Sequence, residues 1–203
     1  FIIFYICNSN FIKMNKQLQR FIRRCITISD DELKPIMSKF HTKSVKRKTI
    51  LQQVGSISSE FYFIVKGGLR VYFLTNQGKE KTRHISLENS IIVALSSFIQ
   101  QKPSLDIIES LEDTELLVIN HTDFYNLVKT NVKWAEFYKI VLETAYINQT
   151  KHLEIGLTHS ASERFEEIIT NNPHYINRLS NKILASYLDI SQETLSRLKS
   201  KVY

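Results

Sequence analysis

The stretch from Leu179 to Leu198, LSNKILASYLDISQETLSRL, constrains the fold of this chain more than any other. Ser180 or Asn181 can cap the start of a first helix and Ser191 the start of a second, because their side-chain oxygens accept a hydrogen bond from a free N–H of the first turn. The apolar residues that follow each cap repeat at helical spacing. Two short helices joined by a tight turn at Asp189 are therefore predicted.

The side chains of these two helices divide into an inner and an outer set. The set predicted to fill the space between the helices is Ile183, Leu184, Ala185, Leu188, Ile190, Leu195 and Leu198. The set that the second helix exposes is Gln192, Glu193, Ser196, Arg197 and Lys199. This is the layout of a helix-turn-helix, whose second helix presents its first residues to base edges in the DNA major groove. Arg pairs with guanine, Gln with adenine and Glu with cytosine, so the exposed set is the candidate DNA-binding site. A helical hairpin used only for packing is the alternative.

Upstream, residues 44–120 have the texture of short strands rich in β-branched and aromatic residues. The expected strands are 49–51, 61–65, 69–73, 83–87, 107–111 and 115–119. Gly67 and Gly68 lie between two of them at hairpin spacing, where a positive φ is expected, and Asn76-Gln77-Gly78 marks the next turn. Short strands at roughly ten-residue spacing predict a β-sandwich or a β-roll.

Helices are expected on both sides of this region. Ser29 and Glu32 form a capping box that opens a helix through Met37, and residues 123–129 form another short helix. A long helix over residues 132–155 follows, and Gly156 is expected to end it or to act as a hinge. A second capping box, Ser160 to Glu163, opens a helix that stops before Pro173.

The long helix carries apolar residues on more than one side, with Ile140 and Leu142 off the main face. Both sides need burial, and a second copy of the same helix is the economical partner, so a homodimer is expected. A single broad face against the chain's own core is the alternative.

The chain has 203 residues, a net charge of +7 and a pI of about 9.3, which suits a polyanionic partner. Residues 13–48 hold 11 basic against 3 acidic side chains, whereas residues 157–203 hold 6 against 5. The basic excess is either a solvated face or a second phosphate-contacting surface. The two cysteines, Cys7 and Cys25, are too few for a disulfide framework and indicate the cytoplasm.

The six histidines lack metal-ligand spacing, so no metal is expected. No stretch has transmembrane length, so no membrane partner is expected. Residues 1–13 carry no signal-peptide features and precede Met14, which opens a plausible start. We interpret them as a mis-called leader.

The stretch ILASYLDISQETLSRL resembles the helix-turn-helix of the Crp/Fnr superfamily of transcription regulators, with Asp189 in place of the usual turn glycine. FYFIVKGGLRVYF is similar to the β-roll signature of that superfamily, and SLEDTELLVINHTDF is similar to the strand that leads into the helix before its dimer helix. The resemblance covers about residues 20–201.

It implies an α+β chain with three parts: an antiparallel β-roll like that of cyclic nucleotide-binding domains, a long dimerisation helix, and a C-terminal helix-turn-helix domain. The expected domains are a sensor with its dimer helix over 14–155 and a DNA-binding domain over 156–203. Because the sequence ends at Tyr203, either the β-hairpin wing is short or absent or the chain is truncated.

The resemblance also places an effector pocket in the roll. Members that bind cyclic nucleotides use a Gly-Glu pair and an Arg-Ser pair, and an ungapped match puts Val93-Ala94 and Ser104-Leu105 there. Without the Glu carboxylate and the Arg cation, cyclic AMP is not the expected effector. The iron–sulfur branch needs a cysteine cluster that two cysteines cannot form, so no cofactor is expected.

Two functions of different classes fit these patterns. The first is a one-component transcription regulator that binds double-stranded DNA and responds to an unidentified effector. The second is a ligand-binding sensor whose C-terminal helices mediate protein contacts, favoured by the small net charge of residues 157–203. An enzyme is not expected, because no catalytic motif is present and acidic residues such as Glu109 and Glu112 fit solvated strand and turn faces.

Overall fold

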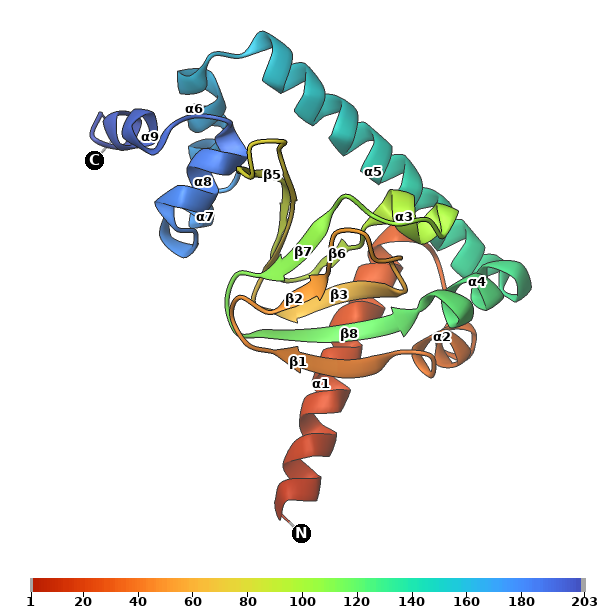
Figure 1. The fold of residues 1–203 in the computed structure, drawn as a ribbon. Helices are drawn as coiled ribbons and strands as arrows, with labels where there is room; N and C mark the ends of the chain where they lie inside the picture. Colours follow the sequence, from red (N-terminus) through yellow and green to blue (C-terminus); the bar gives the residue numbers. More distant parts are fainter. Residues whose placement is uncertain (1, 202–203) are drawn as a thin grey trace. The chain divides into compact units, whose positions relative to one another are not determined.

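The computed structural model of this chain describes the backbone of residues 2–201 and the side chains of residues 14–201 (Figure 1). It divides into two compact units. The first comprises Phe1–Val71 and Ile85–Leu142, and the second comprises Tyr72–His84 and Glu143–Tyr203.

The first unit contains an antiparallel β-roll made from two four-stranded sheets. In spatial order, one sheet consists of β1 (His41–Val45), β8 (Thr114–Asn120), β3 (Glu60–Lys66) and β6 (Ser90–Ile92). The other consists of β2 (Ile50–Gln52), β7 (Ile107–Ser110), β4 (Leu69–Leu74) and β5 (Glu80–Ser86). The predicted β-roll is therefore confirmed, and all six expected strands are present. β1 and β6 were not predicted, because HTKSV and SII carry few of the bulky apolar residues that mark a strand.

Two hydrophobic clusters fill the two sides of the first sheet, because side chains alternate along a strand. Tyr62 and Ile64 point into the roll, where they pack with Leu116 and Val118. Side chains of the opposite parity point outward into a second cluster that the helices complete, among them Phe61, Phe63, Leu117 and Ile119. β3 and β8 pair with Phe63 opposite Leu117, so the same two strands support both layers.

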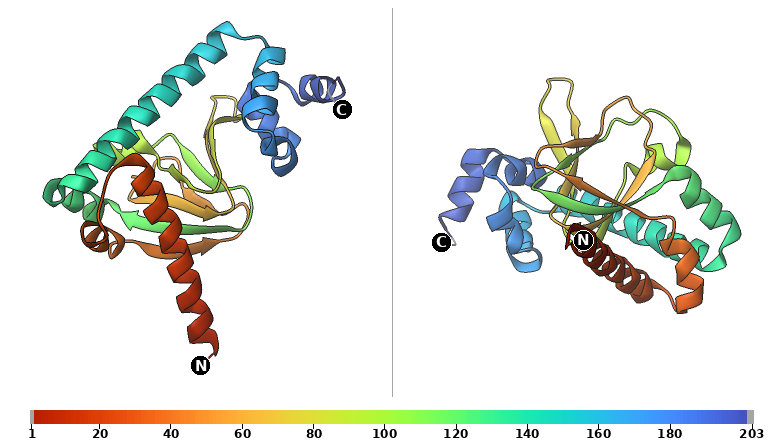
Figure 2. Two further views of the ribbon diagram at one scale, coloured as in Figure 1. Left: turned by 180° about the vertical axis from the view of Figure 1, so that it is seen from behind. Right: turned by 90° about the horizontal axis from the view of Figure 1, so that it is seen from below.

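Five helices accompany the roll: α1 (Ile2–Cys25), α2 (Asp30–Met37), α3 (Leu95–Gln100), α4 (His121–Thr130) and the first part of α5 (Val132–Thr158). α1 packs on the outer face of the sheet that contains β3 and β8 (Figure 2). The capping box of Ser29 and Glu32 that begins α2 is confirmed.

α1 and α3 were not predicted. Met14, Leu18 and Ile22 recur every four residues and are buried, so a test for helical periodicity would have found α1. Its backbone continues through residues 2–13, whose interpretation as a leader stays a prediction.

The turn at Gly67 and Gly68 is not the hairpin that the spacing predicted, because β3 and β4 belong to different sheets. Gly67 has the expected positive φ, 90°, whereas Gly68 does not. A Cβ on Gly67 would lie 2.6 Å from Thr114 Oγ1 and 2.8 Å from the carbonyl oxygen of Asp113. The glycine therefore allows the chain to cross from one sheet to the other directly against the start of β8.

The prediction that Gly156 ends the long helix is also wrong, because α5 continues to Thr158. Its last turn is closed by the N–H of His159, which donates to the carbonyl oxygen of Ile155 at 3.0 Å. Ser160 then caps α6. A glycine inside a helix costs about 1 kcal/mol relative to alanine, which a helix of this length tolerates.

The second unit combines residues 72–84, which form most of the β4–β5 hairpin, with the rest of α5 and four short helices. These helices are α6 (Ala161–Asn171), α7 (His174–Arg178), α8 (Asn181–Leu188) and α9 (Gln192–Lys199). The hairpin turns where predicted: Gly78 has a φ of 73°, and the N–H of Thr75 donates to the carbonyl oxygen of Lys79 at 2.9 Å. None of the described helices combines the length and apolar character that crossing a membrane requires.

Gly67→Ala should lower the free energy of unfolding by about 1–3 kcal/mol more than Gly78→Ala does, because its methyl group meets backbone atoms that cannot move aside. Gly78 has a similar φ in open space, so its substitution carries only the conformational cost of about 1 kcal/mol. Urea titrations followed by circular dichroism measure both. Equal losses in the two variants would contradict the crowding argument.

Candidate nucleic-acid interface

α8 and α9 form the predicted helix-turn-helix. The Ser180 hydroxyl accepts from the N–H of Ile183 at 3.3 Å, and the Ser191 hydroxyl accepts from that of Thr194 at 3.1 Å. Ser180 rather than Asn181 is therefore the cap of the first helix. Each cap satisfies a backbone donor that the first helical turn leaves open, so both helices begin where the sequence indicates.

The turn between the helices depends on Asp189. Its backbone is left-handed, with φ 54° and ψ 48°, and its N–H donates back into the last turn of α8. The N–H of Ile190 donates to the carbonyl oxygen of Ala185 at 3.0 Å, which completes a Schellman-type end. Asp adopts this conformation more readily than most residues, so it can occupy a position that usually favours glycine.

The predicted inner set of apolar residues is largely confirmed. Leu184, Ala185, Leu188, Leu195 and Leu198 are buried, and Ile183 and Ile190 are half-buried. α6 and α7 contribute further buried side chains to this unit, namely Phe165, Ile168 and Tyr175.

The predicted outer set lies on the open side of α9. Gln192, Glu193, Ser196 and Arg197 are exposed, and their positions place them on one face of the helix. Lys199 differs: it is half-buried, and its ammonium group donates to Asn181 Oδ1 at 2.7 Å. The structure therefore brings the four exposed side chains together and turns Lys199 toward α8.

Glu193 stays ionised at neutral pH. Hydrogen bonds from its own backbone N–H and from the Ser191 hydroxyl lower the pKa of its carboxyl group below the ordinary value, and Arg197 adds a smaller effect. The carboxylate therefore acts only as a hydrogen-bond acceptor. That is the role it needs toward a cytosine amino group.

The four candidate effector residues face different surroundings. Ala94 lies in the cluster inside the roll, whereas Val93 packs against the outer cluster. Ser104 is buried and its hydroxyl accepts from the N–H of Asp106 at 2.9 Å, while Leu105 is 79% exposed. Two cavities, of about 450 and 200 Å³, lie beside α1, and none of the four residues lines either.

A buried ion pair on the second sheet was missed. Glu109 on β7 accepts from Arg70 Nε on the neighbouring β4 at 2.7 Å, and their side chains are only 15% and 5% exposed. The prediction that Glu109 lies on a solvated strand face is therefore wrong. A buried charge requires a partner, and an opposite charge on the adjacent strand supplies it.

Much of the basic segment 13–48 is engaged locally. Five of its side chains form ion pairs: Arg23 with Asp30, Lys34 with Asp31, Lys39 with Asp123, Lys43 with Glu60 and Lys46 with Asp113. Lys16, Arg20 and Arg24 differ, because they are exposed, recur every four residues on α1, and meet no carboxylate within the part of the chain that the structure describes.

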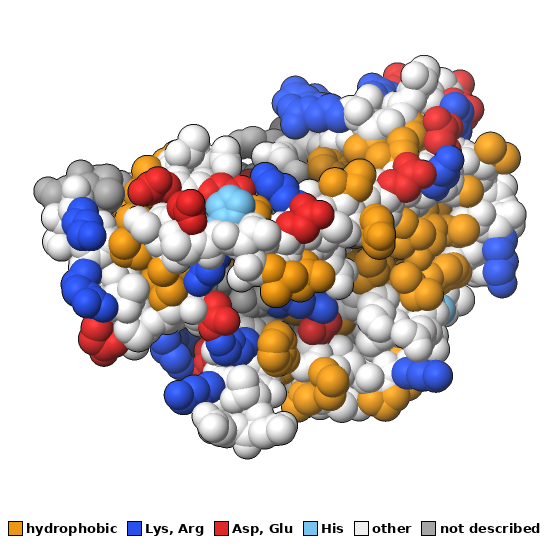
Figure 3. Space-filling view, turned by 90° about the horizontal axis from the view of Figure 1, so that it is seen from above, with side chains coloured by type: hydrophobic (Ala, Val, Ile, Leu, Met, Phe, Trp, Pro, Cys, Tyr) orange, Lys and Arg blue, Asp and Glu red, His pale blue; other side chains and the backbone are white. Residues whose placement is uncertain are grey.

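The second half of α5 exposes large apolar side chains. Tyr146, Ile147, Leu153 and Leu157 are each more than 60% exposed, whereas Trp134, Phe137 and Tyr138 are buried in the first unit. The view from above Figure 1 shows hydrophobic side chains gathered in a patch (Figure 3). The excess of apolar residues on this helix is thus real, and its second half does not bury them.

No three His, Cys, Asp or Glu side chains among residues 14–201 gather as metal ligands.

Comparison with known proteins finds a family that the β-roll resembles. Residues 42–131 match the cyclic nucleotide-binding domain family. The anaerobic regulatory protein of Bacillus subtilis is 24% identical over 182 residues, which cover 84% of this chain and 76% of that protein.

Two solved structures have the same fold. A putative Crp/Fnr-family regulator from Eubacterium rectale has a TM-score of 0.68 at 18% identity, over 84% of this chain and 82% of that one. FixK2 of Bradyrhizobium japonicum has a TM-score of 0.69 at 16% identity, over 80% and 84%. The resemblance is thereby confirmed at the level of the fold: residues 42–131 match the cyclic nucleotide-binding domain family, and the chain has the fold of Crp/Fnr-family regulators.

Proposed function

We propose that this chain is a homodimeric, one-component transcription regulator of the cytoplasm that binds double-stranded DNA through α9 and performs no catalysis. The observation that carries the proposal is the pair of capped helices joined at Asp189, which leaves one polar face of α9 open. This face carries Gln192, Glu193, Ser196 and Arg197, all of which are exposed. A recognition helix uses that region to contact base edges.

The roles of the side chains follow from their hydrogen-bonding groups. Arg197 has the fork of donors that fits guanine O6 and N7, and Gln192 has the amide that fits adenine. Glu193 accepts from cytosine, and Ser196 can bond either a base or a phosphate. Lys199 stands apart, because its ammonium group donates to Asn181 Oδ1, and we assign it no contact with a base.

Dimerisation would bury the apolar side chains of the second half of α5. Tyr146, Leu153 and Leu157 are spaced by seven and four residues, with half-buried Thr150 between them, which is the repeat of a two-stranded coiled coil. Two-fold symmetry would place two copies of α9 in adjacent major grooves, so the operator should be a pseudo-palindrome with half-sites about one helical turn apart.

The effector is proposed to differ from cyclic AMP. At the matched positions, Ala94 has no carboxylate for a ribose hydroxyl, and Ser104 has no cation for a phosphate. Arg70 does not supply the missing cation, because Glu109 already neutralises it.

A protein-binding role for the C-terminal helices is the second candidate. It is favoured by the net charge of only +1 over residues 157–203. Salt dependence separates the two functions, because DNA affinity falls steeply with salt concentration when phosphates are contacted.

Arg197→Ala should reduce affinity for an operator selected from a random library by about 10- to 100-fold, since a lost bidentate contact to guanine costs about 1–3 kcal/mol. Affinity for random-sequence DNA should change much less. Fluorescence anisotropy measures both. Arg24→Ala removes the same charge from α1 and should leave the ratio of specific to non-specific affinity unchanged. If the Arg197 variant keeps the ratio, the assignment of α9 as the reading helix is wrong.

Tyr146→Glu combined with Leu153→Glu should convert the dimer to a monomer, because four carboxylates would face one another across the two-fold axis. Sedimentation velocity reports the mass. Asn148→Glu combined with Gln149→Glu adds the same charge at two exposed polar positions of α5 and should leave the dimer intact. A dimer that survives the first pair would place the interface elsewhere.

Cyclic AMP at millimolar concentration should not raise the melting temperature, because a ligand stabilises a protein only in proportion to its occupancy of the folded state. Differential scanning fluorimetry checks this, with isothermal titration calorimetry as the second measurement. A saturable shift would show that other residues replace the missing Glu and Arg.

A further inference from the structure

Ser186 of α8 occupies the open edge of β5. β5 is the last strand of its sheet, so the backbone groups on its outer side lack a neighbouring strand. The Ser186 hydroxyl donates to the carbonyl oxygen of Glu80 at 2.9 Å and accepts from the N–H of Thr82 at 2.9 Å. One hydroxyl thus pairs the two groups that a further strand would have paired, and Thr82 is buried beneath it.

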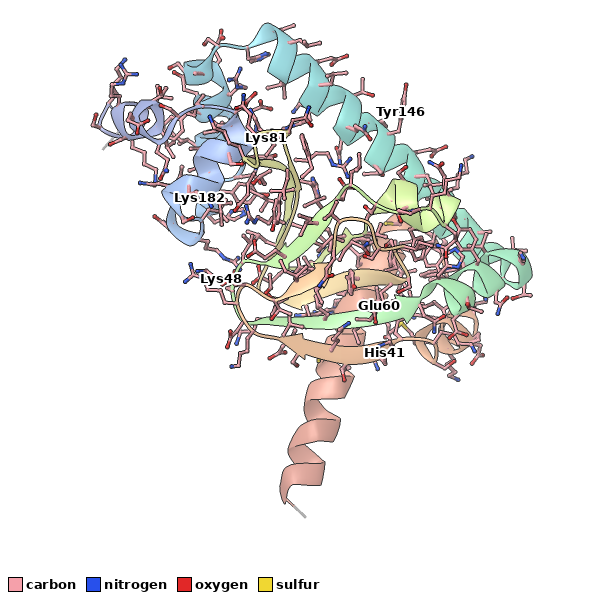
Figure 4. The ribbon with its side chains drawn as sticks, viewed as in Figure 1. His41, Lys48, Glu60, Lys81, Tyr146 and Lys182 are labelled. Atoms are coloured by element: carbon pink, nitrogen blue, oxygen red, sulfur yellow. The ribbon has the colours of Figure 1, made fainter. Side chains whose placement is uncertain are left out.

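Two ion pairs flank this serine. Lys182 Nζ lies 2.9 Å from Glu80 Oε1, and Lys81 pairs with the Asp189 carboxylate. Figure 4 labels the two lysines, one on the hairpin and one on α8. Lys182, Ser186 and Asp189 are spaced by four and three residues and so lie on one face of α8. We call the contact of Glu80, Lys81 and Thr82 with this face the clasp.

The clasp suggests a second role for Asp189, the residue at the turn between α8 and α9. Asp189 adopts a left-handed backbone at some cost in free energy relative to glycine, which is the residue that the resemblance leads one to expect there. A glycine would form the same turn but could not bind Lys81. The carboxylate is therefore suited to holding the hairpin, in addition to ending α8.

Lys182 lies in the first turn of α8, one residue after the helix begins. In a helix-turn-helix the first helix crosses the DNA backbone, and a cation in its first turn is placed to bind a phosphate. In this structure the ammonium group of Lys182 instead donates to the Glu80 carboxylate.

We propose that the clasp is autoinhibitory: the β4–β5 hairpin and a DNA backbone compete for the same face of α8, with Glu80 taking the place of a phosphate. This inference rests on the proposed DNA-binding function. Binding to DNA requires that Lys182 leave Glu80, and an effector that draws the hairpin away from α8 raises DNA affinity without touching DNA. The signal is thus transmitted through three residues of one strand.

Glu80→Gln tests the competition, with Glu166→Gln as the matched control because it removes the same charge from an exposed position on α6. The probe is a random-sequence duplex of about 30 base pairs, which spans two half-sites one turn apart. Glu80→Gln should bind about two- to fivefold more tightly, the range of an exposed ion pair. The plot of log DNA affinity against log salt concentration should become steeper by about one unit for this variant, because Lys182 is free to neutralise one more phosphate. The control should match the wild type.

Asp189→Gly provides a second variant that keeps the fold. It removes the pair with Lys81 and relieves the backbone, so DNA affinity should rise while the melting temperature stays the same or increases. A fall in affinity would mean that the clasp supports the binding-competent state, which overturns autoinhibition.

Hydrogen–deuterium exchange of the full-length protein without DNA examines the clasp alone. Ser186→Ala removes the acceptor of the Thr82 amide, which should then exchange at least several-fold faster. Unchanged exchange at Thr82 overturns the clasp itself. Wild-type binding to DNA without a gain in Glu80→Gln overturns autoinhibition and leaves the proposed function intact, whereas absence of binding in every variant overturns both.

Discussion

The left-handed backbone at Asp189 is the constraint on which the helix-turn-helix depends. It ends α8, turns the chain within three residues, and sets the direction in which Ser191 can start α9. Every side chain proposed to read a base is carried by the helix that this turn aims. Leu188 and Leu195 are buried and stabilise the arrangement of the two helices that this turn sets.

In the β-roll, β3 and β8 contribute side chains to two hydrophobic clusters, one on each face of their sheet. Inward side chains such as Ile64 fill the roll, and outward ones such as Phe63 receive α1 and α5. A one-residue shift in the pairing of these strands would exchange the two sets, so the register is specified on both faces. On the second sheet, Arg70 and Glu109 are buried together as an ion pair, so neither charge is buried without a partner.

The parts of the fold that could be predicted have local causes. Serine caps, a capping box and β-branched runs are legible within a few residues, which is why the two helices of the site and six strands were found. The crossing at Gly67 depends on Thr114, which is distant in the sequence, and β1 pairs with β8 without an apolar pattern of its own. The prediction that Gly156 ends the long helix was wrong because a long helix tolerates a glycine in its interior. The clasp joins residues about a hundred positions apart, and no local pattern in either segment predicts that the two are in contact.

Ser186 also has a consequence for self-association of the open form. When α8 leaves β5, the amide of Thr82 and the carbonyl group of Glu80 become a bare strand edge, which is a template for a strand from another molecule. Alternating charged residues protect such edges, and Lys81 and Arg83 stand on this one. The lysine that closes the clasp would then act as a gatekeeper once the clasp is open, limiting aggregation during the interval before DNA is bound.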